Sequence, residues 1–87
     1  MDNNVTNKGL DYYLNIEMAN RVFQAIDELI EKGVVKNVNQ FCIEADFPRP
    51  NFYRLKREPH MRVPVSVLHL LVNRYKVSAK WLITGKK

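Results

Sequence analysis

The chain has 87 residues with a formal net charge of +5, and its 46% hydrophobic content indicates a folded chain rather than a disordered one. A chain this short closes one modest core, which excludes a separate ligand-binding domain. No apolar run reaches the ~20 residues that span a bilayer, and the polar start MDNN is unlike a secretory signal. We therefore expect a cytoplasmic protein with no membrane partner.

The charge is unevenly distributed along the chain. Residues 1–46 contain four Lys or Arg and eight Asp or Glu, whereas residues 47–87 contain ten Lys or Arg and one acidic residue, Glu58. A cationic half suits a polyanionic partner, because neutralising phosphates releases their counterions. A solvated basic face without any partner explains the charge equally well.

Residues 1–13 are polar and lack an apolar period, so they are predicted to form a flexible arm before a single domain at residues 14–87. From about Ile16, apolar residues recur at spacings of three and four, which predicts an amphipathic helix. Gly33 suits the left-handed cap that ends such a helix. The inward positions are predicted to be Met18, Val22, Phe23, Ile26, Leu29 and Ile30.

Two short helices separated by a tight turn are predicted next. Asn37 can cap the first of them, and Gln40 can reach back as in a capping box. That helix must end near Asp46, because Pro48 disfavours helical geometry in the residue before it. The second helix covers about residues 48–57, since prolines are tolerated in a first turn. The inward side chains of the pair are predicted to be Phe41, Cys42, Ala45, Phe52 and Leu55.

A fourth helix is predicted at residues 64–75 and a fifth at residues 79–84, capped by Ser78 and ended by Gly85. Leu70 and Val67 fall off the apolar stripe of the fourth helix, which slightly favours a contact between two copies of the chain over marginal core. The stripe itself is predicted to be Val65, Leu68, Leu71, Val72 and Tyr75. With no strand pattern in competition, the predicted fold class is all-α, a compact bundle of five helices.

The most informative pattern lies at residues 37–58, where a tight turn joins two short helices and the second has a basic outer face. This is the helix-turn-helix arrangement, in which side chains near the start of the second helix reach base edges in the major groove. Arg49 and Arg54 suit forked contacts to guanine, and Asn51 suits either adenine or the DNA backbone. The residues better placed for phosphates are Tyr53, Lys56 and Arg57.

The segment NVNQFCIEADFPRPNFYRLKRE, together with the closing VSAKWLITG, resembles the lambda-repressor-like (Cro/repressor-type) helix-turn-helix regulators of bacteria and phages. The resemblance covers about residues 20–85 and implies a five-helix bundle whose third helix is the recognition helix. By position, it implies phosphate contacts from Asn37 and Asn39 at the start of the second helix. The base contacts that it implies come from Arg49, Pro50, Asn51 and Arg54.

Several positions depart from the family pattern. Asp46 stands at the usual turn glycine, Pro48 at the usual small polar cap, and Glu58 at the usual glycine after the third helix. Asp tolerates the left-handed conformation that the turn requires. Pro50 replaces a side chain that the family often uses on bases, so readout depends on fewer residues or the helix starts later.

The leading hypothesis is a sequence-specific transcriptional regulator of the repressor type that binds double-stranded DNA. A homodimer is expected, because one helix-turn-helix unit reads only a half-site. The alternative is a protein-interaction module of the same fold, such as an antitoxin-like or anti-repressor partner, which would dock through its acidic first helix and the arm before it. RNA binding is a third reading.

Enzymatic function is not expected, because no phosphate-binding loop, activated nucleophile or acid–base pair is apparent, and neither a cofactor nor a small-molecule substrate is predicted. His60 and His69 lack further ligands at metal-binding spacing, so no metal site is predicted either. Cys42 has no partner for an internal disulfide, which fits a reducing compartment. Its inward position predicts a small apolar core residue rather than a redox switch.

Overall fold

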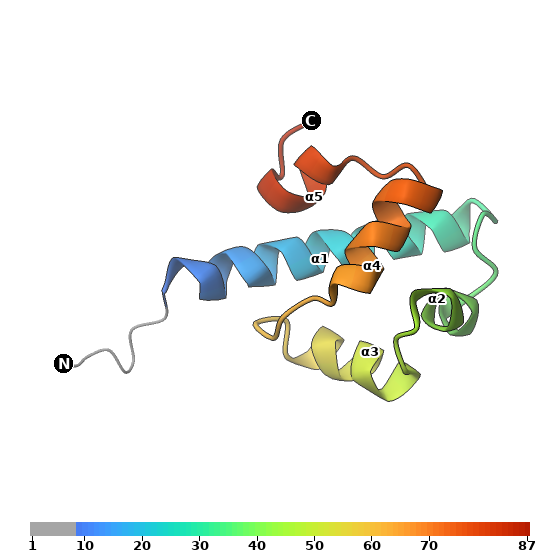
Figure 1. The fold of residues 1–87 in the computed structure, drawn as a ribbon, viewed down its shortest axis with the longest axis horizontal. Helices are drawn as coiled ribbons and strands as arrows, with labels where there is room; N and C mark the ends of the chain where they lie inside the picture. Colours follow the sequence, from blue (N-terminus) through green and yellow to red (C-terminus); the bar gives the residue numbers. More distant parts are fainter. Residues whose placement is uncertain (1–8) are drawn as a thin grey trace.

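The computed structural model describes residues 9–87 of the chain, in which all regular structure is helical and no strand is present. In chain order the elements are α1 (Leu10–Glu31), α2 (Val38–Ala45), α3 (Arg49–Arg57), α4 (Val65–His69) with its π-helical continuation η1 (Leu70–Arg74), and α5 (Ala79–Thr84). The predicted all-α bundle of five helices is thus confirmed over the described residues (Figure 1).

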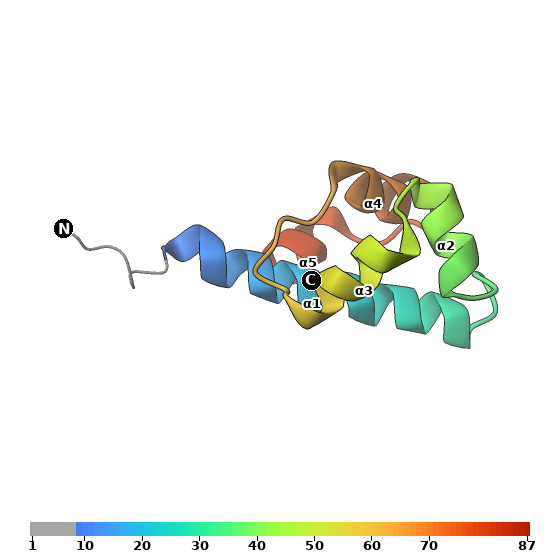
Figure 2. The ribbon, with the colours of Figure 1, turned by 90° about the horizontal axis from the view of Figure 1, so that it is seen from below.

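Helix α1 is the longest element of the bundle, with α5 on one side of it and α3 on the other (Figure 1), and it runs along one edge of the bundle in Figure 2. It begins at Leu10, about six residues before the apolar period starts. Residues 10–13 of the predicted arm thus belong to α1, whereas residues 1–8 lie outside the described part. A long-range contact supports these early turns, because the Asn15 amide donates hydrogen bonds to the carbonyls of Pro59 (3.0 Å) and Met61.

The end of α1 follows the prediction at Gly33. This glycine adopts φ +77°, and its N–H donates to the carbonyl of Ile30 (3.0 Å). The N–H of Val34 donates to the carbonyl of Leu29 (2.9 Å). The two bonds form the Schellman arrangement, which satisfies carbonyls that have no partner within the helix.

The core receives buried side chains from all five helices, and its composition corrects the predicted stripe of the fourth helix. Val65 is 77% exposed, whereas Val67 is 1% exposed and belongs to the core together with Leu71. Leu70 is partly buried against the same core. The predicted contact between copies through Val67 and Leu70 is therefore wrong for Val67. Apolar residues surround this helix on most of its circumference, so packing rather than periodicity selects the buried side.

Helix α5 closes the bundle against α1. The hydroxyl of Ser78 accepts a hydrogen bond from the N–H of Trp81 (3.1 Å), and Gly85 adopts φ +78° after the last turn, as predicted. Arg21 of α1 donates from Nε to the carbonyl of Leu82 (2.9 Å) and from Nη2 to that of Ile83 (3.0 Å). Because the last carbonyls of a helix lack intrahelical partners, this guanidinium holds the end of α5 on α1.

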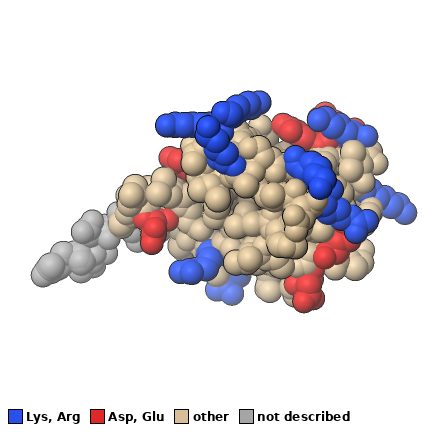
Figure 3. All heavy atoms as spheres, turned by 45° about the horizontal axis from the view of Figure 1, so that its top comes forward, with Lys and Arg blue, Asp and Glu red and all other residues tan. Residues whose placement is uncertain are grey.

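The surface on the α5 side carries charges of both signs. Lys and Arg form several separate groups there, with Asp and Glu among them (Figure 3). The polarised charge of the sequence thus does not become one uniform cationic patch on this face. Among residues 9–87, no helix combines the length and the apolar composition needed to cross a membrane.

Candidate functional site

The start of α2 is fixed by the predicted cap. Asn37 Oδ1 accepts a hydrogen bond from the N–H of Gln40 (2.8 Å), which satisfies one of the free N–H groups of the first turn. Gln40 Oε1 in turn accepts from the N–H of Lys36 (2.8 Å). The reciprocal bond therefore exists, although it reaches the residue before the cap rather than the cap itself.

The turn between α2 and α3 depends on Asp46, which adopts the left-handed conformation with φ +53° and ψ +47°. Its N–H donates to the carbonyl of Ile43 (3.2 Å), and the N–H of Phe47 donates to that of Cys42 (2.9 Å). Phe47 is buried beneath the turn. An aspartate therefore serves here in a backbone conformation that usually favours glycine.

Two prolines do not delay the start of α3. The helix begins at Arg49, with Pro48 in the cap position and Pro50 in the first turn. The carbonyl of Pro48 accepts hydrogen bonds from the N–H groups of Asn51 (2.9 Å) and Phe52 (3.1 Å). Of the two explanations considered for Pro50, a later helix start is therefore wrong.

Helix α3 has a basic outer surface, and the buried side chains of its inner side fix it to the core. Phe52 and Leu55 are buried, and the ring of Phe52 packs edge-on against those of Phe23 and Phe47. No acidic residue lies within the helix. The remaining side chains are all exposed, as predicted: Arg49, Pro50, Asn51, Tyr53, Arg54, Lys56 and Arg57. At the start of α2, Asn37 and Asn39 are also exposed.

The candidate residues of α3 do not all extend in one direction. The ammonium of Lys56 lies 5.7 Å from the centroid of the Phe23 ring, so it sits against α1 in a cation–π contact. Arg49 borders a hollow between α2 and the turn, together with Cys42 and Pro48. The exposed residues of α3 predicted to form one surface thus extend in different directions, and Lys56 lies at the edge of that surface.

Sequence reasoning missed Arg62, which follows α3 in the loop at residues 58–64. It lines a hollow of about 270 Å³ together with Asn51 and Arg54, two predicted base-contacting residues. An arginine in an irregular loop has no period to indicate its direction. Only the return of the chain past α3 brings this third polar side chain to Asn51 and Arg54.

A second missed feature joins α2 to η1. The hydroxyl of Tyr75 donates a hydrogen bond to Glu44 Oε1, and Gln40 Nε2 donates to Glu44 Oε2 (2.9 Å). These bonds, from Tyr75 first and Gln40 second, lower the pKa of Glu44 below its ordinary value. Burial and the bond to Glu44 raise the pKa of Tyr75. The same Gln40 that closes the cap of α2 thereby ties this helix to the end of η1.

Cys42 is buried in the core between α2 and the turn, as predicted. Burial raises the pKa of its thiol, and the nearby charge of Arg49 offsets part of that effect. A protonated, buried thiol is a poor nucleophile. Cys42 therefore packs as a small apolar side chain.

Comparison with protein-family models, with curated proteins and with solved structures found no match to this chain. What the α2–turn–α3 unit (residues 38–57) can do therefore follows from its geometry. It offers a short exposed helix with cationic and hydrogen-bonding side chains, fixed to the core by two buried residues. Such a surface can contact a polyanion and can also distinguish hydrogen-bonding patterns on it.

Proposed function

We propose that this chain is a sequence-specific, repressor-type transcriptional regulator that binds double-stranded DNA, with α3 in the major groove. The supporting observation is the surface of α3. Every side chain of this helix other than Phe52 and Leu55 is exposed, and none is acidic. An α-helix with its side chains is about 10–12 Å across, which fits a major groove about 12 Å wide. This proposal places the chain among the lambda-repressor-like helix-turn-helix proteins and in the cytoplasm.

Within this proposal, the exposed side chains have different roles. Arg54 and Asn51 read bases, joined by Arg49, while Tyr53 and Arg57 contact phosphates. Pro50 offers only apolar contact, for instance to a thymine methyl group. The N-terminus of α2, with Asn37 and Asn39 exposed, suits a further phosphate because the partial positive charge of a helix start favours anions. Two copies would read the two halves of a near-palindromic site.

The experiment is selection from a randomised duplex pool, followed by fluorescence anisotropy on the enriched duplex and on an unrelated one. The parent should enrich a near-palindromic sequence. Arg54→Ala should reduce the preference for it by about 1–3 kcal/mol, because a forked contact to guanine is lost. The matched control is Lys80→Ala, which removes an exposed cation of α5 and should leave the preference unchanged. Equal losses on both duplexes would make Arg54 a phosphate contact only.

A protein partner is the second candidate function, and one observation favours it. A hollow of about 420 Å³ lies beside the turn, lined by Ile43, Phe47, Pro48 and Pro50 among others, and Ile43 is largely exposed. An apolar surface of this kind suits a protein rather than a phosphate backbone. Duplex binding that does not require the exposed residues of α3, or no duplex binding by the folded protein at low salt, would favour this candidate.

A further inference from the structure

The first turns of α1 extend beyond the other helices (Figure 1). All of the buried residues of this helix lie at Ala19 or later. One side of the extension is anchored, because Asn15 bonds to the loop after α3 and the ring of Tyr12 stacks on that of His60, with centroids 5.3 Å apart. The opposite side stays open to solvent at Leu10 and Leu14, although isolated helix turns are only marginally stable in water.

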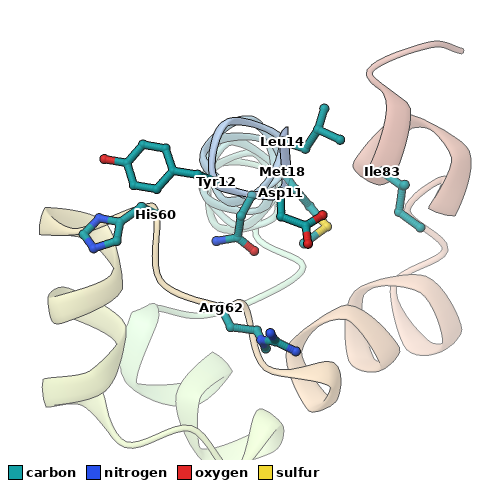
Figure 4. Close-up of a pocket in the computed structure, with 8 residues that line it drawn as sticks. Asp11, Tyr12, Leu14, Met18, His60, Arg62 and Ile83 are labelled. Atoms are coloured by element: carbon teal, nitrogen blue, oxygen red, sulfur yellow. The ribbon is translucent and has the colours of Figure 1, made fainter. Parts of the chain in front are cut away.

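That opposite side is apolar. Leu10 is 72% exposed and Leu14 is 42% exposed, one turn apart on α1, and Ile83 at the end of α5 is 58% exposed. Leu14, Met18 and Ile83 form the apolar part of an open hollow of about 430 Å³ between α1, the loop after α3 and α5, which Tyr12, Asn15 and His60 of the anchored side also line (Figure 4). We call Leu10, Leu14 and Ile83 the α1–α5 patch.

We infer that the α1–α5 patch binds a second copy of this chain. The charges around it support this occupant, because Asp11 on α1 and Arg62 on the loop line the same hollow (Figure 4). A two-fold symmetric contact requires one surface that carries both members of each pair. In such a dimer, Asp11 of each copy faces Arg62 of the other, and Leu14 of each copy packs near Ile83 of the other. A partner of only one charge would meet a like charge at Asp11 or Arg62.

The inferred contact shares only Arg62 with the hollow that Asn51 and Arg54 line. None of the exposed residues of α3 belongs to the patch, so a copy bound there leaves Tyr53, Arg54 and Arg57 accessible. The patch contains few apolar side chains, so the interface belongs to the small class that buries less than about 1,200 Å². We expect a weak dimer with a dissociation constant in the micromolar range.

Sedimentation equilibrium without DNA tests the apolar part of the inference over a wide range of protein concentration. The parent should approach twice its chain mass of 10.3 kDa at high concentration. Leu14→Lys and Ile83→Lys should remain monomeric, because each places a charge in the apolar contact. The matched control is Val65→Lys, a highly exposed aliphatic residue on α4 outside the patch, which should dimerise like the parent. A monomeric parent at every concentration, or equal dimerisation in all three variants, overturns the inference.

A charge exchange tests the pairing itself. Asp11→Arg alone and Arg62→Asp alone should each weaken the dimer by tenfold or more, because each variant opposes two like charges across both symmetric contacts. An equimolar mixture of the two variants should regain the dimer, since in the mixed pair each position 11 faces a position 62 of opposite charge. Circular dichroism shows that each variant is folded. A mixture that stays monomeric overturns the inferred arrangement, whatever the result of the DNA experiments.

Discussion

The hydroxyl of Tyr75 donates a hydrogen bond to the carboxylate of Glu44, across 31 positions of the sequence. Glu44 also accepts from Gln40, whose side-chain oxygen binds the backbone just before the cap of α2. One network therefore connects the end of η1 to the start of α2. The helix that precedes α3 is thus held in its last turn, at Glu44, by a residue from the C-terminal part of the chain.

Tyr75→Phe should lower the free energy of unfolding by about 0.5–1 kcal/mol at neutral pH, near the lower end for a hydrogen bond because the pair is only partly buried. The lowered pKa of Glu44 sets the pH dependence. The charged carboxylate of Glu44 contributes its full stabilisation above the ordinary pKa of a glutamate, about 4.3. This stabilisation is lost as the pH falls through the lower pKa that Glu44 has in the folded protein. The gap between parent and variant should therefore narrow in acid, as measured by urea unfolding at several pH values.

The control for this substitution is Tyr13→Phe, which removes the hydroxyl of an exposed tyrosine on α1. It should leave the stability unchanged at every pH tested. A Tyr75→Phe variant whose deficit stays constant from neutral to acidic pH would contradict the assigned role of the Glu44 charge.

Alanine at Gly33 or Gly85 should destabilise the fold by about 1–2 kcal/mol, because both glycines have positive φ. Gly85→Ala should cost more, since its Cβ would lie 3.0 Å from Nη1 of Arg21, whereas a Cβ at Gly33 meets open space. In an Arg21→Ala background this difference should disappear. Urea unfolding of the single and double variants measures it. An undiminished difference in that background would rule out the guanidinium as its cause.

Asn37→Ala should cost about 1 kcal/mol of stability, because the N–H of Gln40 loses its cap. Gln40→Ala should be coupled to it in a double-mutant cycle, since the two side chains fix the same turn. Asn20→Ala, at an exposed position of α1, is the control and should be close to neutral. Purely additive losses for Asn37→Ala and Gln40→Ala would show that the two bonds act independently.

Lys56→Ala and Arg57→Ala should differ although both remove an exposed cation of α3. Arg57→Ala should reduce the slope of log K for DNA binding against log salt concentration by about one unit, with little change in stability. Lys56→Ala should change the salt dependence less and cost about 0.5–1 kcal/mol of stability, because its ammonium lies over the Phe23 ring. Anisotropy at several salt concentrations, combined with urea unfolding, separates the two. Identical salt slopes would return Lys56 to the phosphate-contacting set.

Local signals were sufficient to predict several parts of the candidate site. Asn37, Asp46 and the prolines at 48 and 50 act on the backbone within a few residues, so their caps and turns are readable from the chain. The burial of Phe52 and Leu55 follows from their spacing in a short basic helix. The positions of Lys56 and Arg62 were not predictable in this way, because each depends on a segment distant in sequence.

The sequence by itself determined the helical class, most helix ends and which side of α3 is exposed, because periodicity, caps and breakers act over one or two turns. Tertiary structure alone decided that α1 starts at Leu10, where Asn15 reaches the loop after α3. It also selected Val67 rather than Val65 for the core, and it joined Tyr75 to Glu44. In each of these cases the deciding contact lies more than ten residues away along the chain, so no local pattern records it.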